Sequence, residues 1–341
     1  MKDKLVLRTG CRIHFGLFPC IDSSGNQHQQ QCFGGLGASL RSPGFEIEFS
    51  AANELELKGN LTAPTLRKRV LRVIRQLGEC GLLGREFSSQ IDAIPVRIDC
   101  HSRIAPHRGL GSGTQIDLAI AKGLLTILEI EENSIANLAT ILHRGTRSRV
   151  GTIAFQDGGL VSDMGGRQET DTTSIRRVNI PNHWRVALFV PRYKVGLSGV
   201  REVEQFRELD CSDMERSETM SSLATGTIVP ACAMQNFTEF ATAVEEFGRL
   251  AGTFFEACQG GTYHGAMVAQ LVDLLKQRGA RGVGQSSWGP TVFAWFENEN
   301  AARKLVTAFI SRMESSVDTA IVCPNNEGAK FWALSRELKE I

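Results

Sequence analysis

The sequence lacks the features that mark secreted and membrane-spanning proteins. No stretch of the 341 residues approaches the roughly 20 consecutive apolar residues of a membrane-spanning helix. The N-terminal segment MKDKLVLRTGCRIHFGL lacks the apolar run of a signal peptide. We therefore expect a cytoplasmic protein without a membrane partner.

Paired cysteine motifs and a dominant charge are also missing. The nine cysteines are odd in number and no two form a CxxC pair, which argues against a zinc site and against a disulfide framework in a chain this long. We expect these cysteines to be reduced. The formal net charge is only +1, so no overall field favours nucleic acid, and we expect no nucleic-acid partner.

What the sequence does contain is a mixture of strand and helix patterns. Hydrophobic residues make up 42% of the chain, enough to bury a core without metal or disulfide staples. Their spacing predicts strands at 5–7, 45–49, 96–100, 185–191, 291–296 and 319–323, and helices at 65–77, 112–128, 135–142, 237–258, 267–275 and 301–313. Because the two types do not alternate regularly, we expect two α+β halves, 1–180 and 181–341.

The clearest chemical signal is the glycine-rich loop within residues 106–115, PHRGLGSGTQ, between a predicted strand and a predicted helix. Its three glycines let the backbone take positive φ and approach a ligand closely. The following helix directs free N–H groups toward that space, as in phosphate sites. Ser112 and Gln115 have capping-box spacing. The alternative is a tight turn without a ligand.

Two further segments have a functional and a structural interpretation. The stretch 282–290, GVGQSSWGP, is either an ordinary turn or a second loop beside the first. Arg144, Arg147 and Arg149 lie within six residues and can bind phosphate through forked hydrogen bonds. A charged run of this kind also fits a solvated face.

Two single residues are candidates for proton or metal chemistry. Asp163 stands between an apolar pair and two glycines, so it is a candidate base or magnesium ligand, or a turn aspartate. His14 follows the first strand in alternation with Ile13 and Phe15, which predicts that it faces the other side. A buried structural histidine is the alternative there.

Five segments, in this order, resemble the β-ribofuranosylaminobenzene 5′-phosphate synthases, a branch of the GHMP kinase superfamily. They read RIHFGL, FGGLGASL, HRGLGSGTQ, RGTRSRVGTIAFQDGGLVSDMGG and GQSSWGPTVFA. The resemblance implies an α+β GHMP-kinase fold, with a ribosomal-protein-like N-terminal half and a ferredoxin-like C-terminal half. In the kinases of this superfamily the middle loop binds ATP. The glutamine run Gln27–Gln31 is longer than the family pattern.

The resemblance also implies a reaction. Such enzymes are pentosyltransferases that condense 4-aminobenzoate or 4-hydroxybenzoate with phosphoribosyl pyrophosphate in tetrahydromethanopterin biosynthesis. Carbon dioxide and pyrophosphate leave, and Mg²⁺ is used. A homodimer is expected for the family.

One position separates this reading from its main alternative, an ATP-dependent small-molecule kinase. In the kinases a second serine of the loop helps to hold magnesium, whereas this chain has Gly113 there. That change weakens the kinase reading unless Thr114 substitutes for the serine. A non-catalytic metabolite-binding protein is the third possibility.

Read through the resemblance, the motifs receive roles. Phosphate binding is assigned to Gly109, Leu110, Gly111, Ser112, Gly113, Thr114, Arg144, Arg147, Ser148 and Arg149. Asp163, His14 and His107 are the expected catalytic residues, and Asp163 is also the expected metal ligand. Substrate binding is assigned to Arg12, which can pair with the benzoate carboxylate, and to Gly284, Ser286 and Ser287.

Overall fold

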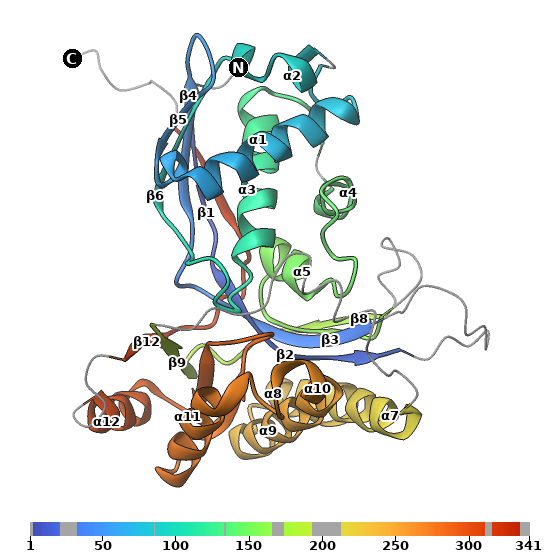
Figure 1. Ribbon diagram of the computed structural model, residues 1–341, viewed down its shortest axis with the longest axis vertical. Coiled ribbons are helices and arrows are strands. Elements are labelled where there is room, and N and C mark those ends of the chain that lie inside the picture. The colour runs from blue at the N-terminus through green and yellow to red at the C-terminus, as the bar shows by residue number, and fades with distance from the viewer. Residues whose placement is uncertain are drawn as a thin grey trace.

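The computed structural model describes residues 3–20, 33–84, 86–132, 134–165, 174–192, 213–310 and 316–334. Within them the strands form three sheets (Figure 1). Across the described residues, no helix is both long and apolar enough to cross a membrane. The seven cysteines in these residues are free thiols, as expected.

The first sheet has five strands, in the order β13 (Lys330–Leu334), β1 (Lys4–Arg8), β4 (Glu46–Ala51), β6 (Val96–Ser102) and β5 (Glu56–Gly59). Helix α3 (Ser112–Ile127) packs against it, and α1 (Pro64–Glu79) packs on α3 (Figure 1). Short elements complete this end: η1 (Asn60–Thr62), α2 (Glu86–Ser89), η2 (Ile91–Ala93) and α4 (Ile135–Ile141). Helix α3 is buried on most sides, so it forms the centre of this layer.

The second sheet crosses the middle of the molecule (Figure 1). Its order is β2 (Cys11–Pro19), β3 (Phe33–Leu40), β7 (Leu160–Asp163) and β8 (Ile175–Val178). One face contacts α5 (Val150–Gln156). The other contacts α7 (Met214–Ser222), α8 (Val229–Ala233) and α9 (Phe237–Phe254), with the π-helical turn η3 (Leu223–Ile228) between α7 and α8. Helices on both faces explain why His14 is buried together with its neighbours Ile13 and Phe15.

The third sheet has the order β10 (Arg281–Gln285), β11 (Val292–Phe296), β9 (Arg185–Pro191) and β12 (Val317–Val322). Helices α11 (Gly265–Gln277) and α12 (Glu299–Ile310) pack on it. The short α10 (Glu256–Gln259) follows α9 after a break at Phe255. Helix α9 contacts both β2 and β10, and so joins the second and third sheets.

The predicted elements are confirmed with small shifts at their ends, and the predicted α+β architecture is confirmed. Five elements around the later site were missed: the strand β2, the glycine-rich strand β3, the short strand β7, the strand β10 and the helix α5. The proposed boundary at 180/181 stays a prediction. Strand β13 nevertheless returns from the C-terminal half to pair with β1 in the N-terminal sheet. The run Gln27–Gln31 lies outside the described residues.

Candidate active site

The glycine-rich loop turns the chain from β6 into α3. Gly109 and Gly111 both have φ near +76°, the left-handed conformation that glycine adopts most readily. Gly111 is the N-cap of α3 and Ser112 is the first helical residue. The predicted capping box is therefore wrong, and the Gln115 side chain instead donates to the Gly151 carbonyl at 3.2 Å. A glycine cap leaves the first helical N–H groups without a side-chain acceptor, as in anion sites at helix N-termini.

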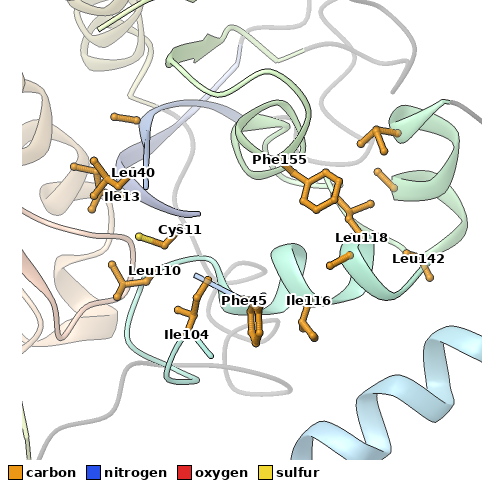
Figure 2. Close-up of a cluster of buried hydrophobic side chains, with 14 of the residues drawn as sticks. Cys11, Ile13, Leu40, Phe45, Ile104, Leu110, Ile116, Leu118, Leu142 and Phe155 are labelled. Atoms are coloured by element: carbon orange, nitrogen blue, oxygen red, sulfur yellow. The ribbon is translucent and has the colours of Figure 1, made fainter. Parts of the chain in front are cut away.

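Leu110 anchors this loop in the hydrophobic core. Its side chain is buried in the hydrophobic cluster that includes Cys11 and Ile104 (Figure 2). Only the backbone of Leu110 can therefore face a ligand at the loop. The hydrophobic anchor and the two left-handed glycines fix the loop conformation before any ligand arrives, which lowers the entropic cost of binding.

Two polar side chains hold the carbonyl of Gly109. Arg12 Nη1 donates to it at 2.7 Å, and Ser286 Oγ donates to it at 2.7 Å. A methyl group at Gly109 would lie 2.2 Å from the Ser286 carbonyl oxygen, so only glycine fits. Arg12 therefore braces the loop, and its expected contact with a substrate carboxylate stays a prediction.

The second glycine-rich segment lies directly against the first. Ser286 Oγ accepts from the His14 N–H at 3.0 Å, and the Ser287 N–H donates to the His14 carbonyl at 2.9 Å. Gly284 lies in β10, where a methyl group would be 2.7 Å from the Phe293 ring. Ser286 and Ser287 join the late loop to β2, whereas Gly284 packs on β11, and the assignment of all three to substrate binding stays a prediction.

His14 extends from β2 toward the loop that precedes α5. Its Nε2 lies 3.4 Å from Ser148 Oγ, and a methyl group at Gly35 would come within 2.9 Å of the ring and 2.6 Å of that hydroxyl. Burial lowers the pKa of His14 well below its ordinary value, and the charge of Arg12 lowers it further. His14 is therefore a neutral imidazole at physiological pH, able to donate or accept a hydrogen bond.

Asp163 ends β7 and forms a buried ion pair with Arg149. Arg149 Nη2 is 2.6 Å from Asp163 Oδ1, and the Arg149 backbone N–H is 2.7 Å from Oδ2. The Gly165 N–H also donates to Oδ1 at 3.1 Å. Both oxygens of the Asp163 carboxylate are thus already occupied by hydrogen-bond donors. Its catalytic role stays a prediction that this geometry does not favour.

The same contacts test whether Asp163 fits magnesium. Both oxygens accept hydrogen bonds from Arg149, and a cation there would face that guanidinium charge. Within the described part of the chain, no three His, Cys, Asp or Glu side chains gather as a metal centre. The residues do not fit a protein-held magnesium at Asp163.

Arg144 lies apart from Arg149, in a cluster on α3. Its Nε donates to Asp117 Oδ2 at 2.7 Å, and Arg72 Nη2 from α1 reaches the same oxygen at 2.6 Å. Arg69 Nη1, also on α1, lies 3.2 Å from Asp117 Oδ1 and 3.1 Å from the Gly113 carbonyl oxygen. Three arginines thus surround one fully buried carboxylate beside the glycine loop.

The remaining predicted residues surround these groups. Ser112, Gly113 and Thr114 form the first turn of α3, and Arg147 is half-buried in the loop before α5. His107 is exposed, with φ of 55°, in the turn that leads into the loop. The structure therefore brings most of the predicted residues to one region but divides the arginines between two different aspartates.

Sequence reasoning missed Arg69, Arg72 and Asp117. The first two belong to the helix predicted at 65–77 from its apolar residues, and its arginines were given no role. Arg69 and Arg72 are three residues apart and so share a face of α1. Asp117 is the one acidic residue in the otherwise apolar or neutral stretch 112–121, which is a signal for a buried ion pair.

Comparison with known proteins agrees with this fold. Residues 68–156 match the GHMP kinases N terminal domain, and residues 228–315 match the GHMP kinases C terminal family. A homoserine kinase from Cytophaga hutchinsonii superposes with a TM-score of 0.66 at 15% identity, covering 97% of this chain and 98% of that one. A mevalonate pyrophosphate decarboxylase from Streptococcus pyogenes gives 0.63 at 13% identity, covering 95% and 98%.

Sequence relatives are more specific. A beta-ribofuranosylphenol 5′-phosphate synthase from Methanothermobacter thermautotrophicus is 27% identical, over 86% of this chain and 89% of its own length. One of the same name from Archaeoglobus fulgidus is 30% identical, over 85% and 87%. On this evidence the chain belongs to the beta-ribofuranosylphenol 5′-phosphate synthase family, built on the GHMP kinase fold.

Proposed function

We propose that this protein transfers the phosphoribosyl group of phosphoribosyl pyrophosphate to an aromatic acid, with loss of carbon dioxide and pyrophosphate. It acts as a beta-ribofuranosylphenol 5′-phosphate synthase, the name its relatives carry. Because that name specifies a phenol, 4-hydroxybenzoate is the acid we favour over 4-aminobenzoate. The same step in tetrahydromethanopterin biosynthesis remains a prediction.

One observation favours this reading over the kinase alternative. In the kinases of the superfamily, a serine at the position of Gly113 is expected to help hold magnesium. Here a methyl group at Gly113 would lie only 2.9 Å from Arg69 Nη1. A guanidinium therefore fills the space of that hydroxyl, and it suits a phosphate oxygen and repels a metal ion. Thr114 instead packs against Gly151 of α5: a methyl group added at Gly151 would lie 3.4 Å from Thr114 Cγ2.

The chemistry needs the leaving pyrophosphate to be stabilised and the two reactants to be aligned. We assign the pyrophosphate to the backbone N–H groups at the start of α3, which Arg12 and Ser286 hold in place through Gly109. The ring carbon that bears the carboxylate attacks the anomeric carbon as pyrophosphate leaves. Loss of carbon dioxide then restores aromaticity.

His14 and Ser148 are the candidates for contact with the aromatic acid. His14 lies on β2 and Ser148 in the loop before α5, and their side chains approach each other to 3.4 Å. A neutral imidazole there offers a hydrogen bond without adding positive charge near the anomeric carbon, where an oxocarbenium ion develops. We assign Arg149 and Asp163 to positioning, since their contact fixes the backbone next to Ser148.

The decisive experiment measures labelled carbon dioxide from carboxyl-labelled 4-hydroxybenzoate with phosphoribosyl pyrophosphate and magnesium. The same assay is run with 4-aminobenzoate, and with ATP in place of the ribosyl donor. We expect release that depends on the ribosyl donor and is faster with 4-hydroxybenzoate. No release with either acid, together with ADP formation on a hydroxyl substrate, would make the protein a kinase.

Two properties remain predictions for the same preparation. Chelation with EDTA tests the magnesium requirement. Gel filtration with light scattering tests the homodimer.

A further inference from the structure

The cluster of Arg69, Arg72 and Arg144 around Asp117 carries charge beyond what its ion pairs use. Three guanidinium groups share one carboxylate, which leaves a net charge of +2. Asp117 is 0% exposed, whereas the three arginine side chains are 28%, 41% and 22% exposed. The buried carboxylate thus holds the three guanidinium groups together, and part of each arginine side chain remains exposed to solvent.

The donors of this cluster are not exhausted either. Each guanidinium has five N–H groups, and Asp117 has only two oxygens to accept them. Among the described residues, the buried Nε of Arg72 has no hydrogen-bond partner. The charges also oppose one another: burial lowers the pKa of Arg69 most, and Arg144 and Arg72 lower it further, against the effect of Asp117. Such crowding is relieved when an anion binds.

The cluster lies beside the glycine loop but forms a separate group. Arg69 connects the two, because its Nη1 donates to the Gly113 carbonyl in the first turn of α3. Arg69 and Arg72 come from α1, and Arg144 follows α4, so two segments converge on α3 (Figure 1). A ligand with two separated phosphate groups can therefore span the helix start and the arginines.

We propose that Arg69, Arg72 and Arg144 form a second anion subsite that binds the phosphate monoester of the ribosyl donor, while the glycine loop takes its pyrophosphate. A phosphate monoester carries a charge close to −2 at neutral pH, which matches the net charge of the cluster. Guanidinium forks suit its oxygens. The identity of this ligand rests on the proposed function, whereas the subsite itself rests on the cluster.

The test is Arg72→Gln, since Arg72 is the most exposed of the three and its loss keeps Asp117 paired with two arginines. Arg67→Gln is the matched control: Arg67 is exposed on the same helix, about 140° around the axis from Arg72. Calorimetry measures binding of ribose 5-phosphate, inorganic pyrophosphate and inorganic phosphate to the full chain, and thermal unfolding without ligand checks the fold.

We expect Arg72→Gln to weaken the binding of ribose 5-phosphate and of inorganic phosphate by about tenfold. The affinity for pyrophosphate should change by less than about twofold. The control should bind all three as the wild type does. Equal weakening of pyrophosphate, or unchanged binding of both phosphate probes, would overturn the subsite. If inorganic phosphate binds and Arg72→Gln weakens its binding, but the assay with phosphoribosyl pyrophosphate releases no carbon dioxide, the proposed function fails and the subsite stands.

Discussion

Two aspartates of this protein hold arginines in opposite ways. Asp163 pairs with the single Arg149, and both side chains are buried, at 2% and 9% exposure. Asp117 is equally buried but faces three arginines that are open to solvent. The first site is balanced and closed, and the second is positive and open.

The difference shows which site is available for ligand. In the balanced pair, the oxygens of Asp163 accept hydrogen bonds from both the side chain and the backbone of Arg149. The two charges neutralise each other within the pair. In the open cluster three partly exposed guanidinium groups share a single carboxylate, so they carry more charge and more donors than Asp117 can use. A cluster that has more cations than anions, with the cations partly exposed, fits an anion site better than a closed pair does.

The largest effect should come from breaking the balanced pair. Asp163→Asn leaves the guanidinium of Arg149 buried without its counter-charge, so the free energy of unfolding should fall by about 3–5 kcal/mol. Urea denaturation at neutral pH measures this loss. The double change Asp163→Asn with Arg149→Met removes both charges and should recover most of it.

Turnover per folded molecule separates structure from chemistry in the same variant. If Asp163 only positions the loop, Asp163→Asn should retain turnover within about tenfold once the folded fraction is accounted for. A much larger loss in fully folded protein would return Asp163 to the role of base. Failure of the double variant to recover stability would show that the pair is not the source of the loss.

A smaller effect is expected at the open cluster. Asp117→Asn keeps the shape but removes the shared counter-charge, and the partly exposed arginines can turn to water. The free energy of unfolding should therefore fall by only about 1–3 kcal/mol. Because binding to the folded state adds stability, phosphate buffer should restore part of this loss relative to chloride at equal ionic strength.

Phosphate distinguishes the two aspartates directly. Phosphate should raise the free energy of unfolding of Asp117→Asn more than that of the wild type. It should raise that of Asp163→Asn by no more than it raises that of the wild type. Equal phosphate stabilisation of all three proteins would break the contrast between an open and a closed site.

The smallest effect concerns His14, a buried group kept neutral. Below its ordinary pKa of 6.5 the unfolded chain takes up a proton at His14, whereas the folded protein does so only at a lower pH. Stability from His14 is therefore complete above pH 6.5 and is lost as pH falls toward the lower folded pKa. The limit is about 1.4 kcal/mol for each pH unit.

His14→Asn should flatten that part of the stability profile, measured by urea denaturation between about pH 5 and pH 8. His101→Asn, the same substitution at an exposed histidine on β6, is the control. An unchanged profile in His14→Asn would mean that His14 has the same pKa in the folded and the unfolded protein, which would contradict the effect of burial.

Strong apolar patterns made the longer helices and several of the strands predictable. Strand β9 was found because it is a short continuous apolar run, and helix α3 because its apolar residues follow the helical period. Strand β3 was missed because glycines, which are uncommon in strands, occupy several of its positions. They are needed because of residues from other segments: Gly35 leaves room for His14 and Ser148. Helix α5 is short and follows the arginine run that hid it.

Local sequence also determined the glycine loop, since positive φ at Gly109 and Gly111 needs no distant residue to be inferred. Which arginine meets which aspartate was decided by tertiary structure alone. Arg144 and Arg149 are five residues apart yet pair with Asp117 on α3 and Asp163 on β7. Charge pairing depends on distance in space, and only the packing of α1, α3 and the second sheet sets those distances.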